Sequence, residues 1–384
     1  MILKKSAITV TLILLLCCMV SGTVCASDTL ADSADAESSL LDEFDFKDLN
    51  QGLKKLLPEN KLTFQNLFDM VKSGDFEQIR QTFLQTISDQ FFYELRYHKR
   101  TFVQIIFTAV IAAIFTNFSN AFRNRQISEI SFYVLYLLLL SLCLNSFQLA
   151  VDVAEAELEH ILTFMQILCP TYLLAVAIAV GSSTSIVFYQ IVLFLIYLVE
   201  LVVISILIPS VHIYIMVQLM NYMTEEETFT QLAELIEKLI VWTLKAMTAL
   251  VIGINLIQRL LAPALDHLKR SALTRSAEAI PAIGDAMSGT TEVLLGSAVV
   301  IKNSIGISGA LICVMLLMVP LLKLGFMVIM FKLASAVTQP ISDKRITGCL
   351  TGISKGGELL LRILYTVTVL FLVTIAIIAS TTHV

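Results

Sequence analysis

The sequence predicts an all-helical protein that crosses a membrane several times. Of its 384 residues, 57% are hydrophobic and 15% are charged, and the mean hydropathy is +0.82. Soluble domains have about 45–50% apolar and about 25% charged residues. The apolar residues form long uncharged blocks, and a helix needs about 20 such residues to cross a bilayer. The net charge of −5 argues against the basic surface that nucleic-acid-binding domains need, so we expect no nucleic-acid partner.

Residues 1–26 are typical of a signal peptide. Lys4 and Lys5 precede an apolar run from Ala7 to Val20. Val24-Cys25-Ala26 then offers small residues at the two positions that a signal peptidase recognises. We therefore expect cleavage after Ala26, with an uncleaved membrane anchor as the alternative.

Residues 27–100 have the composition of a soluble segment, and we expect them on the exported side of the membrane. Phe64, Leu67, Phe68 and Val71 repeat at helical spacing, and a second such series runs from Phe76 to Phe91. The segment is therefore predicted to form two or three amphipathic helices. These helices either pack on each other or on the membrane bundle, or they provide a docking surface for another exported protein.

Residues 101–384 are predicted to form a bundle of about seven transmembrane helices. The spans are expected at residues 101–118, 130–151, 161–180, 186–208, 238–261, 305–331 and 359–380. Lys and Arg in short loops favour the cytoplasmic side, which places the loop around Arg125 inside and the acidic stretch from Asp152 to Glu159 outside. Basic residues on both sides of the span with Pro320 conflict with a single crossing. A broken or re-entrant element near residues 300–337 would resolve that conflict.

Three charged residues are candidates for a role inside the membrane. Glu200 is expected roughly 12 Å deep in its span, at a rise of 1.5 Å per residue, which is too deep for its short side chain to reach the interface. Intramembrane acids usually pair with a base or mark a conduction or proton path. Lys245 and Lys323 are the candidate partners, although a long Lys side chain can also reach the interface by itself.

Small residues mark two further candidate sites. Residues 262–310 hold most of the small residues of the carboxyl-terminal half, and glycines spaced by three or four let helices approach closely. Each site is a candidate for packing within the chain or for subunit assembly. The two sites are the segment with Lys302, Asn303, Gly306 and Gly309, and the helix face with Gly348, Gly352 and Gly356.

Motifs for catalysis do not emerge from the sequence. The five histidines are scattered, and they form neither an H-E-x-x-H motif nor a set of metal ligands. The cysteines outside the signal peptide lack C-x-x-C spacing and are expected to be buried free thiols: Cys143, Cys169, Cys313 and Cys349. We therefore expect no enzyme activity, no metal and no cofactor.

The order of signal peptide, acidic helical segment and hydrophobic bundle resembles the stage III sporulation protein AE family of endospore-forming bacteria. The most specific likeness is the Lys-Asn-x-x-Gly-x-x-Gly run from Lys302 to Gly309, followed by Pro320-Leu-Leu-Lys323. Ala262-Pro263 and Pro281-Ala-Ile-Gly284 add to the likeness. The resemblance covers essentially the whole chain.

The resemblance implies a non-enzymatic, multi-pass subunit of a channel or secretion-like complex in sporulation. Such a complex joins mother cell and forespore, and the forespore needs it to develop after engulfment. This subunit is expected in the mother-cell membrane around the forespore. Its expected partners are a cytoplasmic ATPase, ring-forming subunits and a forespore membrane protein. The alternative is a self-contained secondary transporter that uses Glu200 as its coupling acid.

Overall fold

The computed structural model describes residues 46–56, 63–74, 125–180, 182–223, 228–277, 284–340 and 342–380, and scattered helical positions between 77 and 114. Within these ranges the fold is all-helical, as predicted. The expected signal peptide and most of the expected span 101–118 lie outside them. The helices are α3 (Lys47–Leu56), α4 (Phe64–Ser73), α6 (Arg125–Val180), α7 (Ser182–Val202), the π-helix η1 (Val203–Leu207), α8 (Ile208–Met223), α9 (Thr230–Ala277), α10 (Gly284–Thr338) and α11 (Lys344–Ser380).

Five apolar helical segments in the described part of the chain are long enough to cross a membrane, where we expected about seven. They are Tyr136–Ala179, Tyr189–Tyr222, Thr230–Ile257, Gly296–Thr338 and Lys344–Ala379. One expected span falls in the region outside the described residues. The other difference arises because the expected spans 130–151 and 161–180 belong to one segment.

The acidic stretch that we expected to be an exported loop is instead the middle of α6, a single helix of 56 residues. Local pairs satisfy two of these acidic groups within the helix. The Gln148 side-chain amide donates a 2.8 Å hydrogen bond to Asp152, one turn away. Glu157 and His160 form a similar pair, with 3.3 Å between Oε2 and Nδ1. Acidic residues at helical spacing can therefore continue a helix, and the prediction of a loop here was wrong.

α10 likewise continues without a break through Pro320 over its 55 residues. The broken or re-entrant element that we expected near residues 300–337 is therefore not present in the structure. Proline removes one backbone hydrogen bond, and within a bundle the neighbouring helices can compensate for such a loss. Pro320 is buried among those neighbours.

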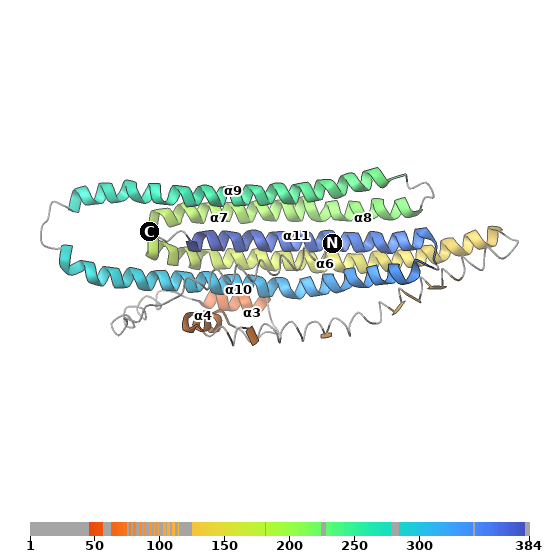
Figure 1. Ribbon diagram of the computed structural model, residues 1–384, viewed down its shortest axis with the longest axis horizontal. Coiled ribbons are helices and arrows are strands. Elements are labelled where there is room, and N and C mark those ends of the chain that lie inside the picture. The colour runs from red at the N-terminus through yellow and green to blue at the C-terminus, as the bar shows by residue number, and fades with distance from the viewer. Residues whose placement is uncertain are drawn as a thin grey trace.

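The long helices lie side by side in one elongated bundle (Figure 1). α10 packs most extensively on α11 and α6, and α6 packs on α7. α9 lies along the outside, next to α7 and α8 (Figure 1). Buried side chains from α6, α7, α8, α9, α10 and α11 form one continuous apolar core.

The helices α3 and α4 form a small pair that covers α6 and α10 (Figure 1). The Asn50 side chain links them by accepting a 2.9 Å hydrogen bond from the backbone N–H of Phe64. Thr63 caps the start of α4, and Gly74 ends it in the left-handed conformation, at φ 72°. The predicted apolar face of α4 is buried, so the amphipathic pattern in this part of the sequence is confirmed. The pair packs on the bundle, which was one of the alternatives left open.

Candidate functional site

Charged side chains gather halfway along α6, where they are half-buried or exposed. The Glu157 side chain is only 16% exposed and pairs with His160. Lys323 of α10 lies close enough for its charge to attract the Glu157 carboxylate. An acidic neighbour of Lys323 was expected, but the expected residue was Glu200. Glu157 was missed because the acidic stretch was predicted to be a loop outside the membrane.

Glu200 and Lys245 are not brought together with Lys323. Glu200 is half-buried on α7, and Lys245 is exposed on α9. In the described part of the chain, no ion pair involves Glu200. α6 ends at Val180 and α7 begins at Ser182, and the two helices pack antiparallel (Figure 1), so Glu200 lies at about the height of His160. The π-helix η1 begins three residues after Glu200, and π-helical turns in α-helices are frequent at functional sites.

Lys302 is completely buried, and its ammonium lies at the carboxyl-terminal end of α11. The Lys302 Nζ donates a 2.9 Å hydrogen bond to the carbonyl oxygen of Ala379. The last carbonyls of a helix lack partners within it and carry partial negative charge. Lys302 therefore neutralises the end of α11 from a neighbouring helix. Asn303 beside it is half-buried.

Gly306 and Gly309 lie where α10 meets α6. A Cβ at Gly306 would lie 2.9 Å from the Tyr172 hydroxyl oxygen, and one at Gly309 would lie 2.6 Å from Leu168 Cδ2. The Tyr172 hydroxyl also donates a 3.3 Å hydrogen bond to the carbonyl oxygen of Ile375 on α11. Tyr172 therefore connects three helices through the space that Gly306 leaves open.

Gly348, Gly352 and Gly356 lie where α11 meets α8. Tyr222 of α8 overlaps the position of a Cβ at Gly348 and is the second neighbour of Gly352. Gly356 faces Ile215 of α8. The four-residue spacing of these glycines therefore matches the spacing of the α8 side chains that pack against them, Tyr222, Gln218 and Ile215. Both glycine groups pack against helices of the same chain.

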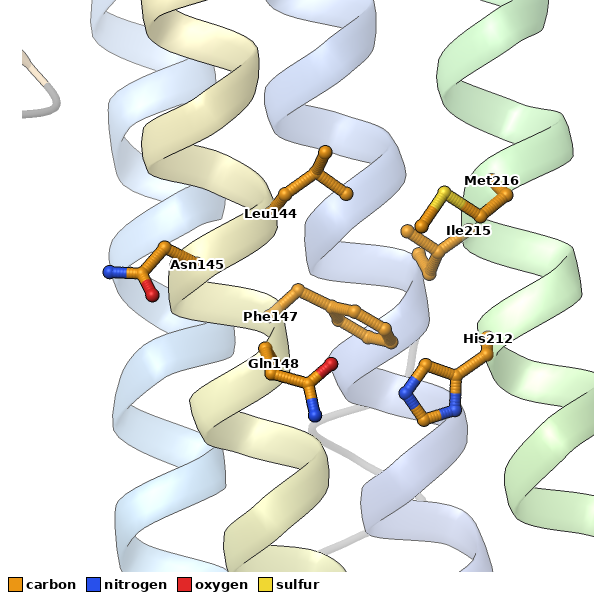
Figure 2. A pocket seen from close by; sticks show the side chains of 7 residues that line it. All are labelled: Leu144, Asn145, Phe147, Gln148, His212, Ile215 and Met216. Carbon is orange, nitrogen blue, oxygen red and sulfur yellow. The ribbon is translucent and has the colours of Figure 1, made fainter.

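A lateral pocket of about 260 Å³ opens between α6 and α8. Figure 2 shows Gln148 of α6 and His212 of α8 projecting toward each other across it. The His212 ring lies edge-on to Phe147, with 6.0 Å between the ring centroids. Asn145 adds a third polar side chain to the otherwise apolar wall. Sequence reasoning missed this pocket, because its two walls are more than sixty residues apart along the chain.

Metal binding finds no support in the part of the chain that the structure describes. Those residues contain no group of three or more His, Cys, Asp or Glu side chains that could hold a metal ion. Cys143, Cys169, Cys313 and Cys349 are free and buried, as expected. What the geometry offers is close helix packing, a half-buried Glu157–His160 pair and a lateral pocket.

Comparison with known proteins agrees with this architecture. Residues 62–382 match the family model of stage III sporulation protein AE. The chain is 25% identical over 349 residues to stage III sporulation protein AE of Bacillus subtilis (strain 168), which covers 91% of this chain and 86% of that protein. No solved structure matches the chain. Because the family match extends over most of the chain and over all five apolar helical segments, this membrane protein belongs to the stage III sporulation protein AE family.

Proposed function

We propose that the chain is a non-enzymatic subunit of a channel-like complex that joins mother cell and forespore. Family membership over residues 62–382 is the observation that carries this proposal. The subunit lies in the mother-cell membrane around the forespore and supports forespore development after engulfment. Its partners are a cytoplasmic ATPase, ring-forming subunits and a membrane protein of the forespore.

The lateral pocket supports an assembly role. It is open to the outside of the bundle, and it presents Asn145, Gln148 and His212 within an apolar surface. Polar side chains of this kind can hydrogen-bond a neighbouring helix in a membrane, where apolar contact alone gives little specificity. A helix of another subunit is therefore a suitable neighbour for the pocket.

Purification in mild detergent from sporulating cells tests the proposal. A tagged chain should co-purify with the ATPase and the ring-forming subunits. The double variant Gln148→Leu with His212→Leu should reduce this co-purification, and Gln190→Leu, which changes an exposed polar residue on α7 outside the pocket, is the matched control. If the intact chain purifies without these proteins, or if cells lacking it form spores normally, the proposal is wrong.

The alternative, a secondary transporter that uses Glu200, has one observation in its favour. Glu200 lies three residues before the π-helix η1, half-buried in an apolar helix. A transporter should move a solute across liposomes that contain this chain alone. Solute uptake driven by a pH gradient and lost in Glu200→Gln would favour the transporter. If Glu200→Leu is inserted and abundant while sporulation fails after engulfment, Glu200 has a role in the complex.

A further inference from the structure

The bundle is too long for one bilayer. At 1.5 Å per residue, α6 measures about 84 Å, whereas the hydrocarbon core of a bilayer is about 30 Å thick. α10, with 55 residues, is nearly as long. Lipid can therefore surround only part of the bundle, and the distribution of charges along the helices indicates which part.

Charged residues from three helices meet at one height, in a region that we call the mid-bundle belt. The packing of Gly306 on Tyr172 and of Gly309 on Leu168 sets the height of α10 relative to α6. The packing of Gly356 on Phe147 sets the height of α11. The mid-bundle belt consists of Asp152, Glu155, Glu157, Glu159 and His160 on α6, Lys323 on α10 and Arg362 on α11.

Trp242 of α9 lies at the edge of the same belt. Asn221 of α8 donates a 2.9 Å hydrogen bond to Thr230, which fixes the height of α9 relative to α8. Trp242 is about three helical turns beyond Thr230, and its side chain is 69% exposed. Trp is enriched where a bilayer meets water. An exposed Trp beside a belt of charges is therefore typical of a membrane interface.

Between the mid-bundle belt and the end of the bundle where α6 ends and α7 begins, four helices carry long uncharged runs. Each run is about 27–30 Å long at 1.5 Å per residue, which matches the hydrocarbon core. Lys302 directly precedes the run in α10, and its ammonium is held at the far end of α11. The runs are residues 161–180 of α6, 182–199 of α7, 303–322 of α10 and 363–380 of α11. We call this part of the bundle the uncharged half.

The other half of the bundle is less suited to lipid. Lys238 of α9 is 78% exposed, and Lys332 of α10 is 52% exposed. Lys355 of α11 is exposed as well. Lys238 pairs with Glu234, and Lys332 pairs with Glu358. These charged groups on three helices make this half less favourable in lipid than the uncharged half.

The two sides of the uncharged half differ in polarity. On the α7 side, Phe194 and Tyr197 are 53% and 62% exposed. On the other side, Gly52 of α3 faces Ile167, which places the α3–α4 pair at the height of the uncharged runs. The outer side of this pair exposes Gln65 and Asp69, together with Lys47, Gln51, Asn66 and Lys72. Such side chains at bilayer depth need water or protein around them.

We propose that lipid surrounds the bundle only from the mid-bundle belt to the end where α6 ends and α7 begins, and only on its α7 side. The α3–α4 side faces a water-filled space. α9 contributes to the lipid contact only over its uncharged residues 246–258, since Arg259 follows them. The inference of a water-filled space rests on the proposed function as a channel subunit, whereas the inferred position of the bilayer does not.

Nitroxide labels on single cysteines test this proposal. The full chain, with its native cysteines replaced and still able to support sporulation, is placed in liposomes of phosphatidylcholine and phosphatidylglycerol. Oxygen concentrates in lipid, and nickel ethylenediaminediacetate stays in water. Labels at Phe194→Cys and Tyr197→Cys should collide more often with oxygen than with nickel. Labels at Gln65→Cys and Asp69→Cys should show the reverse.

Labels at Ile213→Cys and Met220→Cys on α8, in the other half, decide the position of the bilayer. Both side chains are more than half exposed. If these labels collide mainly with oxygen, the bilayer covers the other half and the proposal is overturned. If the labels at Gln65 and Asp69 collide mainly with oxygen, the water-filled space is refuted. These outcomes do not depend on co-purifying partners, so they are separable from a failure of the proposed function.

Discussion

Gly356 is the position in the bundle where one added methyl group should destabilise the protein most clearly. A Cβ at Gly356 would overlap Ile215 Cδ1 of α8 and would lie 2.9 Å from Phe147 Cε2 of α6. Because two helices confine the site from different directions, neither can move away without disturbing the other. Overpacking of this kind typically costs about 1–3 kcal/mol. We therefore expect Gly356→Ala to lower the melting temperature of the detergent-solubilised protein.

Gly253→Ala on α9 is the matched control. A Cβ at Gly253 has no neighbour within 4 Å. Alanine gains about 0.5–1 kcal/mol over glycine in a helix interior, and this gain is common to both variants. The difference between the two melting temperatures therefore isolates the overpacking. In chains of 150–250 residues, each kcal/mol of lost stability lowers the melting temperature by about 2–4 °C, and in longer chains the shift is smaller.

A third variant refines this comparison. At Gly352 the nearest atom is Gln218 Cγ, 3.1 Å from the Cβ position, and it belongs to a flexible side chain. Gly352→Ala should therefore melt between the other two variants. If Gly356→Ala and Gly253→Ala have equal melting temperatures, α8 does not pack on α11 as the structure has it, and the reasoning is refuted.

Three further perturbations follow from the same contacts. Lys302→Met removes a hydrogen bond to a charged group, and such bonds contribute about 1.5–3 kcal/mol to stability. The amide hydrogens in the last turn of α11 should therefore exchange faster with solvent, and an unchanged exchange rate would contradict the hydrogen bond between Lys302 and Ala379. Lys323→Leu should lower the stability of the protein. Adding Glu157→Gln should restore part of the lost stability, because interacting residues show coupling energies of about 0.5–3 kcal/mol. Strictly additive effects of the two substitutions would show that the two side chains do not interact. Gly306→Leu with Gly309→Leu should abolish co-purification with partners and also the melting transition, while alanine at both positions is partly tolerated.

The sequence patterns were informative where the signal is local. The apolar periodicity of α4 identified its buried residues, because an amphipathic helix needs only its own spacing to show which face is apolar. The buried free state of the four cysteines followed from their apolar surroundings. The uncharged blocks likewise identified the residues that form long apolar helices.

Features that depend on contacts between distant segments were not predictable in this way. Loop prediction failed at Glu157, because four acidic residues within eight positions are typical of solvent-exposed turns, and only the neighbouring helix supplies Lys323. The side chains that pack against Gly306 and Gly356 could not be predicted from the sequence either. Which side chain fills the space beside a glycine depends on the register between two helices, and no local pattern encodes that register.

In the complex that we propose, the position of the two glycine groups limits where other subunits can bind. Gly306 and Gly309 receive α6 side chains, and Gly348, Gly352 and Gly356 receive α8 side chains. These glycines therefore allow close packing of helices within one chain. A leucine at any of these glycine positions disrupts the fold before it can affect an interface with another subunit. Contacts between subunits must then use the outer surface, where the lateral pocket between α6 and α8 combines exposed apolar residues with polar groups. A variant that keeps its melting transition and loses its partners can come only from such a surface, which makes the Gln148 and His212 substitutions more informative about assembly than any substitution of a glycine.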